Sequence, residues 1–195
     1  TAVDGELKVL MGIRDQIRPG VKEDLQKLKR LGVKNLVLLS GDNQGTVDLA
    51  ARELGLTEAH GHMLPEDKSE YIQELQDKGQ IVAFVGDGVN DSPSIALAQI
   101  GIAMGSGTDV AIETSDIVLM NSDFSRLPHA LGLTKATANN MRQNIVIAVG
   151  VVLVLLASVF FSEWMNMSIG MLVHEVSILA VILNGMRLLS YKLRY

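Results

Sequence analysis

The stretch "VGDGVNDSP", Val85–Pro93, directly follows the apolar run "IVAF", Ile81–Phe84. A turn needs one or two small or polar residues, whereas this stretch holds two aspartates, an asparagine and two glycines. In open α/β sheets, ligands bind beyond the carboxyl ends of the strands. We therefore expect a functional site, rather than a simple turn, at Gly86–Asp91.

The first 123 residues alternate between short apolar runs and helical patterns. The runs lie within "NLVLLSGD" (Asn35–Asp42), "QIVAFVGDG", "IGIAMG" and "DIVLM", and they suit strands that are buried on both faces of a parallel sheet. Helix start and stop signals predict four helices: from Pro19 to a stop at Gly32, over about 44–54 with a stop at Gly55, over about 67–78 with a stop at Gly79, and from a cap at Asp91 or Ser92. This alternation predicts an α/β fold with a doubly wound parallel sheet.

The remaining residues, 124–195, contain two long apolar segments. The segment 145–161 has no charged residue, and the segment 165–183 has only His174 and Glu175 as ionisable residues. Each is about as long as a helix that crosses a bilayer. Lys and Arg flank the pair and are missing from the short loop, so the positive-inside rule places both ends in the cytoplasm. We expect an α-helical transmembrane hairpin in the plasma membrane; two buried helices of a soluble protein are the alternative.

Composition limits the possible functions. The net charge of −5 argues against a broad nucleic-acid-binding surface. The chain has no cysteine, which excludes disulfides and thiolate metal ligands. The opening "TAVDGELKVL" has charges among its apolar positions and no initial Met, so we interpret it as the interior of a longer protein rather than as a signal peptide.

The residues of the acidic turn have the chemistry of a phosphate and metal site. Asp87 would lie just past its strand, where a carboxylate suits Mg²⁺, and Gly86 and Gly88 would let the backbone approach a phosphate. A second acidic turn, "SGDN" (Ser40–Asn43), follows another predicted strand. Each feature alone is compatible with an ordinary turn, but their shared position at strand ends favours a site.

Three further residues could contact a phosphoryl group. Ser40 could donate its hydroxyl and Gly41 its N–H to a phosphoryl oxygen. Lys68, in the helix-opening "LPEDK", could neutralise phosphate charge as lysines do in other phosphoryl-transfer sites.

Several motifs together resemble a known family. "IRDQIRPG", "LLSGDN", "LPEDK", "VGDGVNDSP" and "GIAMGSGTDVAIETSDIVLM" resemble the phosphorylation domain of P-type ATPases, which has a haloacid dehalogenase-like fold. "MRQN" (Met141–Asn144) and "LNGMRLL" (Leu183–Leu189) resemble the last two membrane helices of the heavy-metal class of these pumps. The resemblance implies that 1–123 is the C-terminal portion of a phosphorylation domain and 124–195 a membrane region.

The resemblance also implies roles for individual residues. Asp87 matches the Mg²⁺ ligand of the family, and Lys68 matches the lysine that contacts the phosphoryl group. The remaining positions match a Thr-Gly-Asp phosphate-contacting segment, with Ser for Thr, and the polar pair that completes the site: Ser40, Gly41, Asp42, Asn90 and Asp91.

One departure from the family bears on activity. The D-K-T-G-T motif with the nucleophilic aspartate is missing from these 195 residues, and so is the T-G-E loop of the actuator domain. We therefore expect this chain to be inactive alone, because Mg²⁺ and electrostatic contacts do not replace a covalent nucleophile. Its expected partners are the remainder of the pump (actuator domain, nucleotide-binding domain and earlier membrane helices), with ATP as substrate.

The second apolar segment carries a candidate transport site. His174 and Ser177 share a helix face and Glu175 is adjacent, and ionisable residues within a membrane span are functional candidates. "HEVSI" resembles the H-E-G-G/S-T motif of the cobalt/iron/zinc-type subgroup, although Val176 and Ile178 depart from it. Imidazole and carboxylate suit divalent transition metals; a purely structural His–Glu pair is the alternative.

The leading interpretation is part of an ATP-driven exporter of a divalent heavy metal (Zn, Co, Fe or Cd) that works through an aspartyl phosphate. One alternative is a catalytically inactive, truncated membrane protein with a regulatory or interaction role. Another is a membrane-anchored phosphatase, which the missing nucleophile also disfavours. Nearby methionines could suggest Cu⁺, but we interpret them as packing or lipid-facing residues: Met165, Met167 and Met171.

Overall fold

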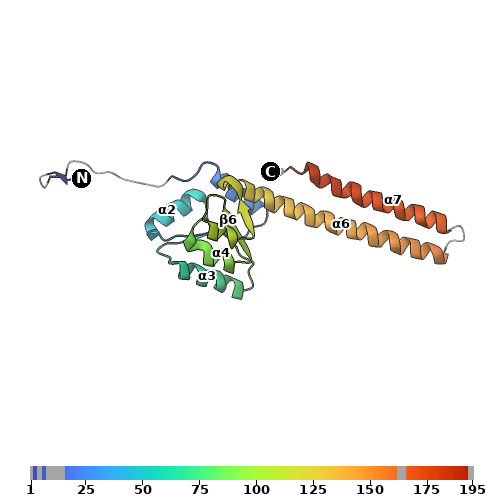
Figure 1. Ribbon diagram of the computed structural model, residues 1–195, viewed down its shortest axis with the longest axis horizontal. Helices are drawn as coiled ribbons and strands as arrows, with labels where there is room; N and C mark the ends of the chain where they lie inside the picture. The colour runs from blue at the N-terminus through green and yellow to red at the C-terminus, as the bar shows by residue number, and fades with distance from the viewer. Residues whose placement is uncertain (1, 4–5, 8–15, 162–165, 193–195) are drawn as a thin grey trace. The chain divides into compact units, whose positions relative to one another are not determined.

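The computed structural model describes residues 2–3, 6–7, 16–161 and 166–192 (Figure 1). Its internal contacts divide the chain into two units, one made of Thr1–Lys29 and Val33–Ser125 and the other of Arg30–Gly32 and Arg126–Tyr195. The first unit is α/β and the second is helical.

Parallel strands form the centre of the first unit. The strands β5 (Ala83–Gly86), β6 (Ile100–Met104) and β7 (Ile117–Leu119) pair in that order, and β3 (Val37–Leu39) pairs with β4 (Glu58–His60). The short strands β1 (Ala2–Val3) and β2 (Glu6–Leu7) form a separate antiparallel pair. Because parallel strands need crossover connections, helices separate them along the chain. The predicted α/β class is therefore confirmed.

Among its described residues this unit has five α-helices, the first of which ends at its boundary: α1 (Val21–Arg30), α2 (Gln44–Leu54), α3 (Pro65–Asp77), α4 (Ser92–Leu97) and α5 (Asp109–Glu113). Local sequence explains where they begin and end. The Asn43 side chain accepts a hydrogen bond from the Thr46 N–H at 3.0 Å and caps α2. Gly55 ends α2 in the left-handed conformation, with φ of 69°. The predicted glycine stops are thereby confirmed for this helix.

The core of this unit lies where α4 and α5 pack on the β5–β6–β7 sheet. It consists of Ile95, Ala103 and Ala111, with Phe84 and Ile112 packed against them. Gly101 permits this packing, because a Cβ atom there would lie 2.4 Å from the Ile95 carbonyl oxygen. Since α4 begins directly after the acidic turn, its packing on β6 fixes the position of that turn.

The structure corrects several predicted boundaries. The helix predicted over 67–78 begins at Pro65, and the strand predicted within "QIVAFVGDG" lies at Ala83–Gly86. Asp91 is the N-cap residue of α4, but its side chain makes no capping hydrogen bond. Its carboxylate instead accepts a hydrogen bond from a distant lysine. Strand β4 and helix α5 were not predicted, because both are short and β4 ("EAH") is polar.

The second unit is a helical hairpin. Helix α6 (Arg126–Phe161) and helix α7 (Met167–Met186) run antiparallel along each other (Figure 1), and a 3-10 turn at Arg187–Ser190 follows α7. Their most apolar windows are 0% and 6% buried, so the described residues do not enclose them as a protein core would. Both helices are long and apolar enough to cross a membrane. The predicted span 145–161 is the C-terminal part of α6, and the predicted span 165–183 starts at a residue outside the described ones.

Candidate functional site

The acidic turn occupies the carboxyl end of β5. Asp87 is exposed there, and its carbonyl oxygen accepts a hydrogen bond from the Thr108 N–H at 3.2 Å. Gly86 is buried, and a Cβ atom at this position would lie 2.6 Å from the Cβ of Asp91. Gly86 therefore lets the Asp91 side chain fold over the end of the strand. At Gly88, a Cβ atom would meet only the Asn90 nitrogen at 3.9 Å, so this backbone stays open to approach.

A lysine on helix α3 forms an ion pair with the acidic turn. The Lys68 ammonium in the first turns of α3 lies 2.7 Å from Asp91 Oδ1, and the two side chains are 13% and 17% exposed. A Ser69–Ser94 hydroxyl contact of 3.2 Å lies next to the pair and also joins α3 to α4. The ion pair is thus largely shielded from solvent, and the packed helices α3 and α4 hold it in place. If one of the two charges were removed, little water could reach the other.

The turn after β3 is bonded to the turn after β4. The Ser40 N–H donates to the His60 carbonyl at 2.9 Å, and the Met63 N–H donates to the Ser40 carbonyl at 3.0 Å. A Cβ atom at Gly61 would lie 2.8 Å from the Asp42 carbonyl oxygen, so the close approach of the two turns requires glycine. Because α3 begins shortly after Met63, these bonds link the Ser40–Asp42 turn to the helix that carries Lys68.

The Ser40 hydroxyl faces its own turn. It donates to Asp42 Oδ2 at 3.0 Å and accepts from the Asp42 N–H at 3.2 Å. Asp42 thus orients the Ser40 hydroxyl, and the hydroxyl proton is already donated to the Asp42 carboxylate. A phosphoryl oxygen would have to compete with Asp42 for that proton.

The structure therefore joins some predicted residues directly. Lys68 pairs with Asp91, whose side chain lies against Gly86, whereas the Ser40–Asp42 turn is linked to them through the start of α3. Asn90 is exposed, and nothing in the described contacts assigns it a role.

Sequence reasoning missed the loop after β6. Besides the Thr108 bond to Asp87, a Cβ atom at Gly107 would lie 2.9 Å from the Asp87 carbonyl oxygen. The signal was present in "GSGTD" (Gly105–Asp109), which also follows a strand, but only the strand order shows that this loop meets the β5 turn.

A tyrosine on α3 has a perturbed ionisation. Burial, followed by the negative charge of Glu58 and a hydrogen bond to it, raises the pKa of the Tyr71 phenol above its ordinary value of 10.0. The His60 ring packs against Tyr71 with 4.9 Å between ring centroids, and its Nε2 lies 2.6 Å from Glu58 Oε1. Tyr71 therefore stays a neutral side chain that packs α3 against β4.

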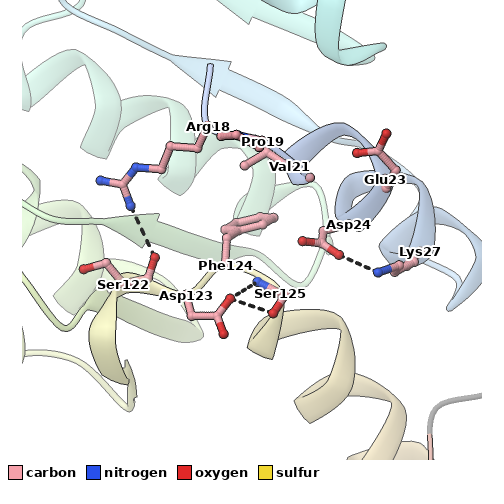
Figure 2. A pocket seen from close by; sticks show the side chains of 11 residues that line it. Arg18, Pro19, Val21, Glu23, Asp24, Lys27, Ser122, Asp123, Phe124 and Ser125 are labelled. Atoms are coloured by element: carbon pink, nitrogen blue, oxygen red, sulfur yellow. Dashed lines mark hydrogen bonds and ion pairs between the residues drawn. The ribbon is translucent and has the colours of Figure 1, made fainter. Parts of the chain in front are cut away.

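A separate cavity of about 400 Å³ lies beside the start of α1 (Figure 2). Arg18 donates to the Ser122 carbonyl at 3.2 Å, and Asp24 pairs with Lys27 at 2.7 Å. The Arg18 bond joins the "IRPG" segment to residues 122–125, whereas the Asp24–Lys27 pair lies within α1. The lining contains none of the site residues predicted from the sequence, so this cavity is distinct from the acidic turn.

In the hairpin, the candidate metal ligands lie on α7. His174 and Glu175 are exposed, and the Ser177 hydroxyl donates to the His174 carbonyl at 2.6 Å within the helix. Within the described residues, no group of three His, Asp or Glu side chains comes together as a metal cluster. The transport site therefore stays a prediction, and Ser177 already uses its proton locally.

Comparison with known proteins shows similarity to one hydrolase family and to metal-transporting ATPases. The profile of the haloacid dehalogenase-like hydrolase family matches residues 1–99. The chain is 39% identical over 192 residues to a cadmium-transporting ATPase of Staphylococcus aureus, with 96% of the chain and 26% of the relative covered. It is 40% identical over 187 residues to a zinc-transporting ATPase of Bacillus subtilis (strain 168), with 96% and 29% covered.

A solved structure of a metal-transporting ATPase is also similar to most of this chain. The crystal structure of a zinc-transporting PIB-type ATPase in the E2.Pi state is 39% identical, with a TM-score of 0.80 over 90% of this chain and 28% of that chain. The chain thus spans about a quarter of the length of the relatives it matches. Its homologues are heavy-metal-transporting P-type ATPases. The chain belongs to the haloacid dehalogenase-like hydrolase family.

Proposed function

We propose that this chain forms the C-terminal part of an ATP-driven exporter of a divalent heavy metal. The observation that carries the proposal is the sheltered Lys68–Asp91 pair at the end of β5, on the same chain as an apolar hairpin. The similarity to cadmium- and zinc-transporting ATPases over nearly the whole chain supports it. We include in this proposal a boundary at about residue 123, with phosphoryl chemistry before it and metal transport after it.

The residues at the acidic turn fit Mg²⁺. Asp87 offers an exposed carboxylate, and the described residues contain no cluster of three acidic or histidine ligands. Mg²⁺ is usually held by one or two carboxylates, with waters and substrate phosphates completing the shell. The bound ion would neutralise charge on a phosphoryl group. Asp87 would hold it, and Gly86 and Gly88 would leave room for the group beside the backbone.

Lys68 would act on the phosphoryl group directly. Its ammonium is held by Asp91 at the carboxyl edge of the sheet, and it would turn toward a phosphoryl oxygen while Asp91 keeps its position. Ser40 would donate its hydroxyl in place of the present bond to Asp42, and the Gly41 N–H would add a second donor. Asn90 and Asp91 would complete the polar surround. The aspartyl nucleophile and the ATP-binding surface would come from other parts of the full-length protein.

The hairpin would carry the metal. His174 and Glu175 would be ligands to the transported divalent ion, with Ser177 as a neighbouring oxygen donor and ligands from other helices completing the shell. We further propose that both ends of the hairpin are cytoplasmic, because Lys and Arg flank the helices, and that the membrane is the plasma membrane.

The direct test is ATP hydrolysis by the full-length protein in proteoliposomes, with Zn²⁺, Cd²⁺, Co²⁺, Fe²⁺ and Mn²⁺ added one at a time. Stimulation by at least one ion is expected. A protein that hydrolyses no ATP with any of these ions would instead support the inactive, regulatory alternative.

A further inference from the structure

A groove of about 520 Å³ lies between α6 and α7 within the hairpin. Its lining comes from both helices and from the turn after α7: Arg142, Gln143, Val146, Ile147, Asn184 and Arg187. The apolar segment of α6 begins at Ile145 and that of α7 ends at Leu183. The groove therefore lies at the level where the apolar part of the hairpin ends.

A network of amides fixes the two walls of the groove at the same level. The Asn184 Nδ2 donates to Asn144 Oδ1 at 2.9 Å and to Gln143 Oε1 at 3.2 Å. The buried Asn140 donates to the Asn184 carbonyl at 2.7 Å. These three hydrogen bonds between the two apolar helices give this end of the hairpin a defined geometry, because each amide would otherwise lose its partner in an apolar setting.

The same network orients one of the two guanidinium groups. Arg187 Nη1 donates to Asn184 Oδ1 at 2.9 Å, which leaves its other N–H groups for the groove. Arg142 is exposed on the opposite wall. Among the described residues, neither guanidinium has a carboxylate partner. Two uncompensated cations on one groove, in a chain with a net charge of −5, indicate an anionic ligand.

The rest of the lining selects the kind of anion. Val146 and Ile147 provide an apolar wall that continues toward the apolar part of α6. A free phosphate would bind the two arginines but would make no apolar contact with Val146 and Ile147. A phospholipid would contact both parts of the groove, since its phosphate would bind the arginines and its acyl chains would pack against the apolar wall. Guanidinium groups suit phosphate because they form paired hydrogen bonds with it.

We propose that this groove binds the phosphate of an anionic phospholipid, with Arg142 and Arg187 as its ligands and Val146 and Ile147 against the acyl chains. The inference rests on the proposed membrane insertion of the hairpin, which places the groove at headgroup depth. Basic pockets between membrane helices on the cytoplasmic side bind anionic headgroups in this way. Asn184 is then a positioning residue, which holds both the second helix and the Arg187 guanidinium.

The test uses the complete 195-residue chain and two lipids with identical acyl chains, dioleoyl phosphatidylglycerol and dioleoyl phosphatidylcholine. The chain is delipidated in neutral detergent and mixed with each lipid, and retained lipid is counted by native mass spectrometry. We expect selective retention of phosphatidylglycerol. Because each basic residue near an anionic surface contributes about 1 kcal/mol, Arg142→Gln and Arg187→Gln should each lower affinity about fivefold and the double variant about 30-fold. Equal retention of the two lipids by the unsubstituted chain would overturn the proposal without any variant.

Two controls isolate the groove. Lys192→Gln removes one exposed charge from the same end of the hairpin but not from the groove lining, so it should change affinity less than twofold. A loss equal to that of Arg142→Gln would mean that the lipid senses only overall charge. Inorganic phosphate at millimolar concentration should not displace the lipid; if it does, the groove is a free-phosphate site.

Vesicle flotation separates this inference from the proposed function. If the chain does not float with phosphatidylcholine vesicles, the membrane hairpin itself is wrong, and the lipid site is wrong with it. If it floats but shows no preference for phosphatidylglycerol, only the lipid site is wrong. The full-length protein should show the same preference; its loss there would mean that another helix covers the groove, and the proposal would be overturned.

Discussion

The Lys68 ammonium lies 2.7 Å from Asp91 Oδ1 and thereby ties α3 to the turn that follows β5. The two residues are 23 positions apart in sequence. The pair brings a cation to the turn at the carboxyl end of β5, the same turn that carries the exposed Asp87. The pair is therefore a structural contact that would also position Lys68 for phosphoryl chemistry.

Replacing this lysine should weaken the α/β unit. In Lys68→Met, Asp91 loses its charged partner in a sheltered place, which should lower the free energy of opening by about 1–3 kcal/mol. Hydrogen exchange of the β5 and α4 amides measures that opening. The matched control is Lys78→Met, because the Lys78–Glu74 pair spans 3.4 Å and its side chains are 63% and 67% exposed. Equal effects of the two substitutions would show that the Lys68–Asp91 pair contributes no more than a surface pair.

Tyr71 should titrate later than an ordinary tyrosine. Burial and Glu58 raise its pKa above 10.0, so its folded-state pKa exceeds its unfolded value. The stability from this shift is fully present below about pH 10 and is lost as pH rises through the folded pKa. Absorbance at about 295 nm should show a late component that disappears in Tyr71→Phe and moves to lower pH in Glu58→Gln. An unchanged titration in Glu58→Gln would remove Glu58 as a cause.

Asp87→Asn in the full-length protein should nearly abolish phosphoenzyme formation from ATP at limiting Mg²⁺. The substitution keeps the shape of the side chain and its place past β5 but removes the charge that would hold the ion. Raising Mg²⁺ should restore part of the signal on an acid gel. Asp77→Asn, at the last residue of α3, is the matched control. Normal phosphorylation of Asp87→Asn at limiting Mg²⁺ would leave Asp87 as a turn residue only.

The orientation of the hairpin can be tested in the 195-residue chain, which has no cysteine of its own. Ser162 lies between the two helices in the sequence, and Ser190 ends the 3-10 turn after α7. A cysteine placed at Ser162 should react with an impermeant thiol reagent added to intact cells. A cysteine placed at Ser190 should react only after lysis. The reverse pattern would invert the proposed topology.

Local patterns predicted the elements with strong signals. Gly55 ends α2 as expected, because a left-handed glycine acts on its neighbouring residues alone. The Asn43 cap acts just as locally, but it was not predicted. The N-cap expected at Asp91 or Ser92 is at Asp91, but its side chain makes no capping hydrogen bond, since a tertiary partner, Lys68, takes its carboxylate. Strand β4 has only three residues, and its pairing with β3 rather than its composition makes it a strand.

Contacts between distant segments could not be predicted from spacing. The roles of Gly107 and Thr108 depend on β6 lying beside β5, which sequence periodicity does not specify. The start of α6 at Arg126, well before the apolar segment, also lacks a hydropathy signal, because residues 126–144 are mixed in polarity. The hydrogen bonds of Asn184 with Asn140 and Asn144 depend on how α6 and α7 align along each other. The sequence of either segment alone does not show this alignment.

The most direct test of the central claim, that one chain links phosphoryl chemistry to metal transport, is the metal dependence of phosphoenzyme formation in the full-length protein. His174→Ala and Glu175→Ala should abolish metal-stimulated phosphorylation from ATP, because they remove the proposed ligands of the transported ion. Phosphorylation from inorganic phosphate, which needs only the site around Lys68 and Asp87, should persist. If both variants retained the unsubstituted protein's response to Zn²⁺, Cd²⁺ and Co²⁺, the His174–Glu175 pair would be structural and the account of transport would be contradicted.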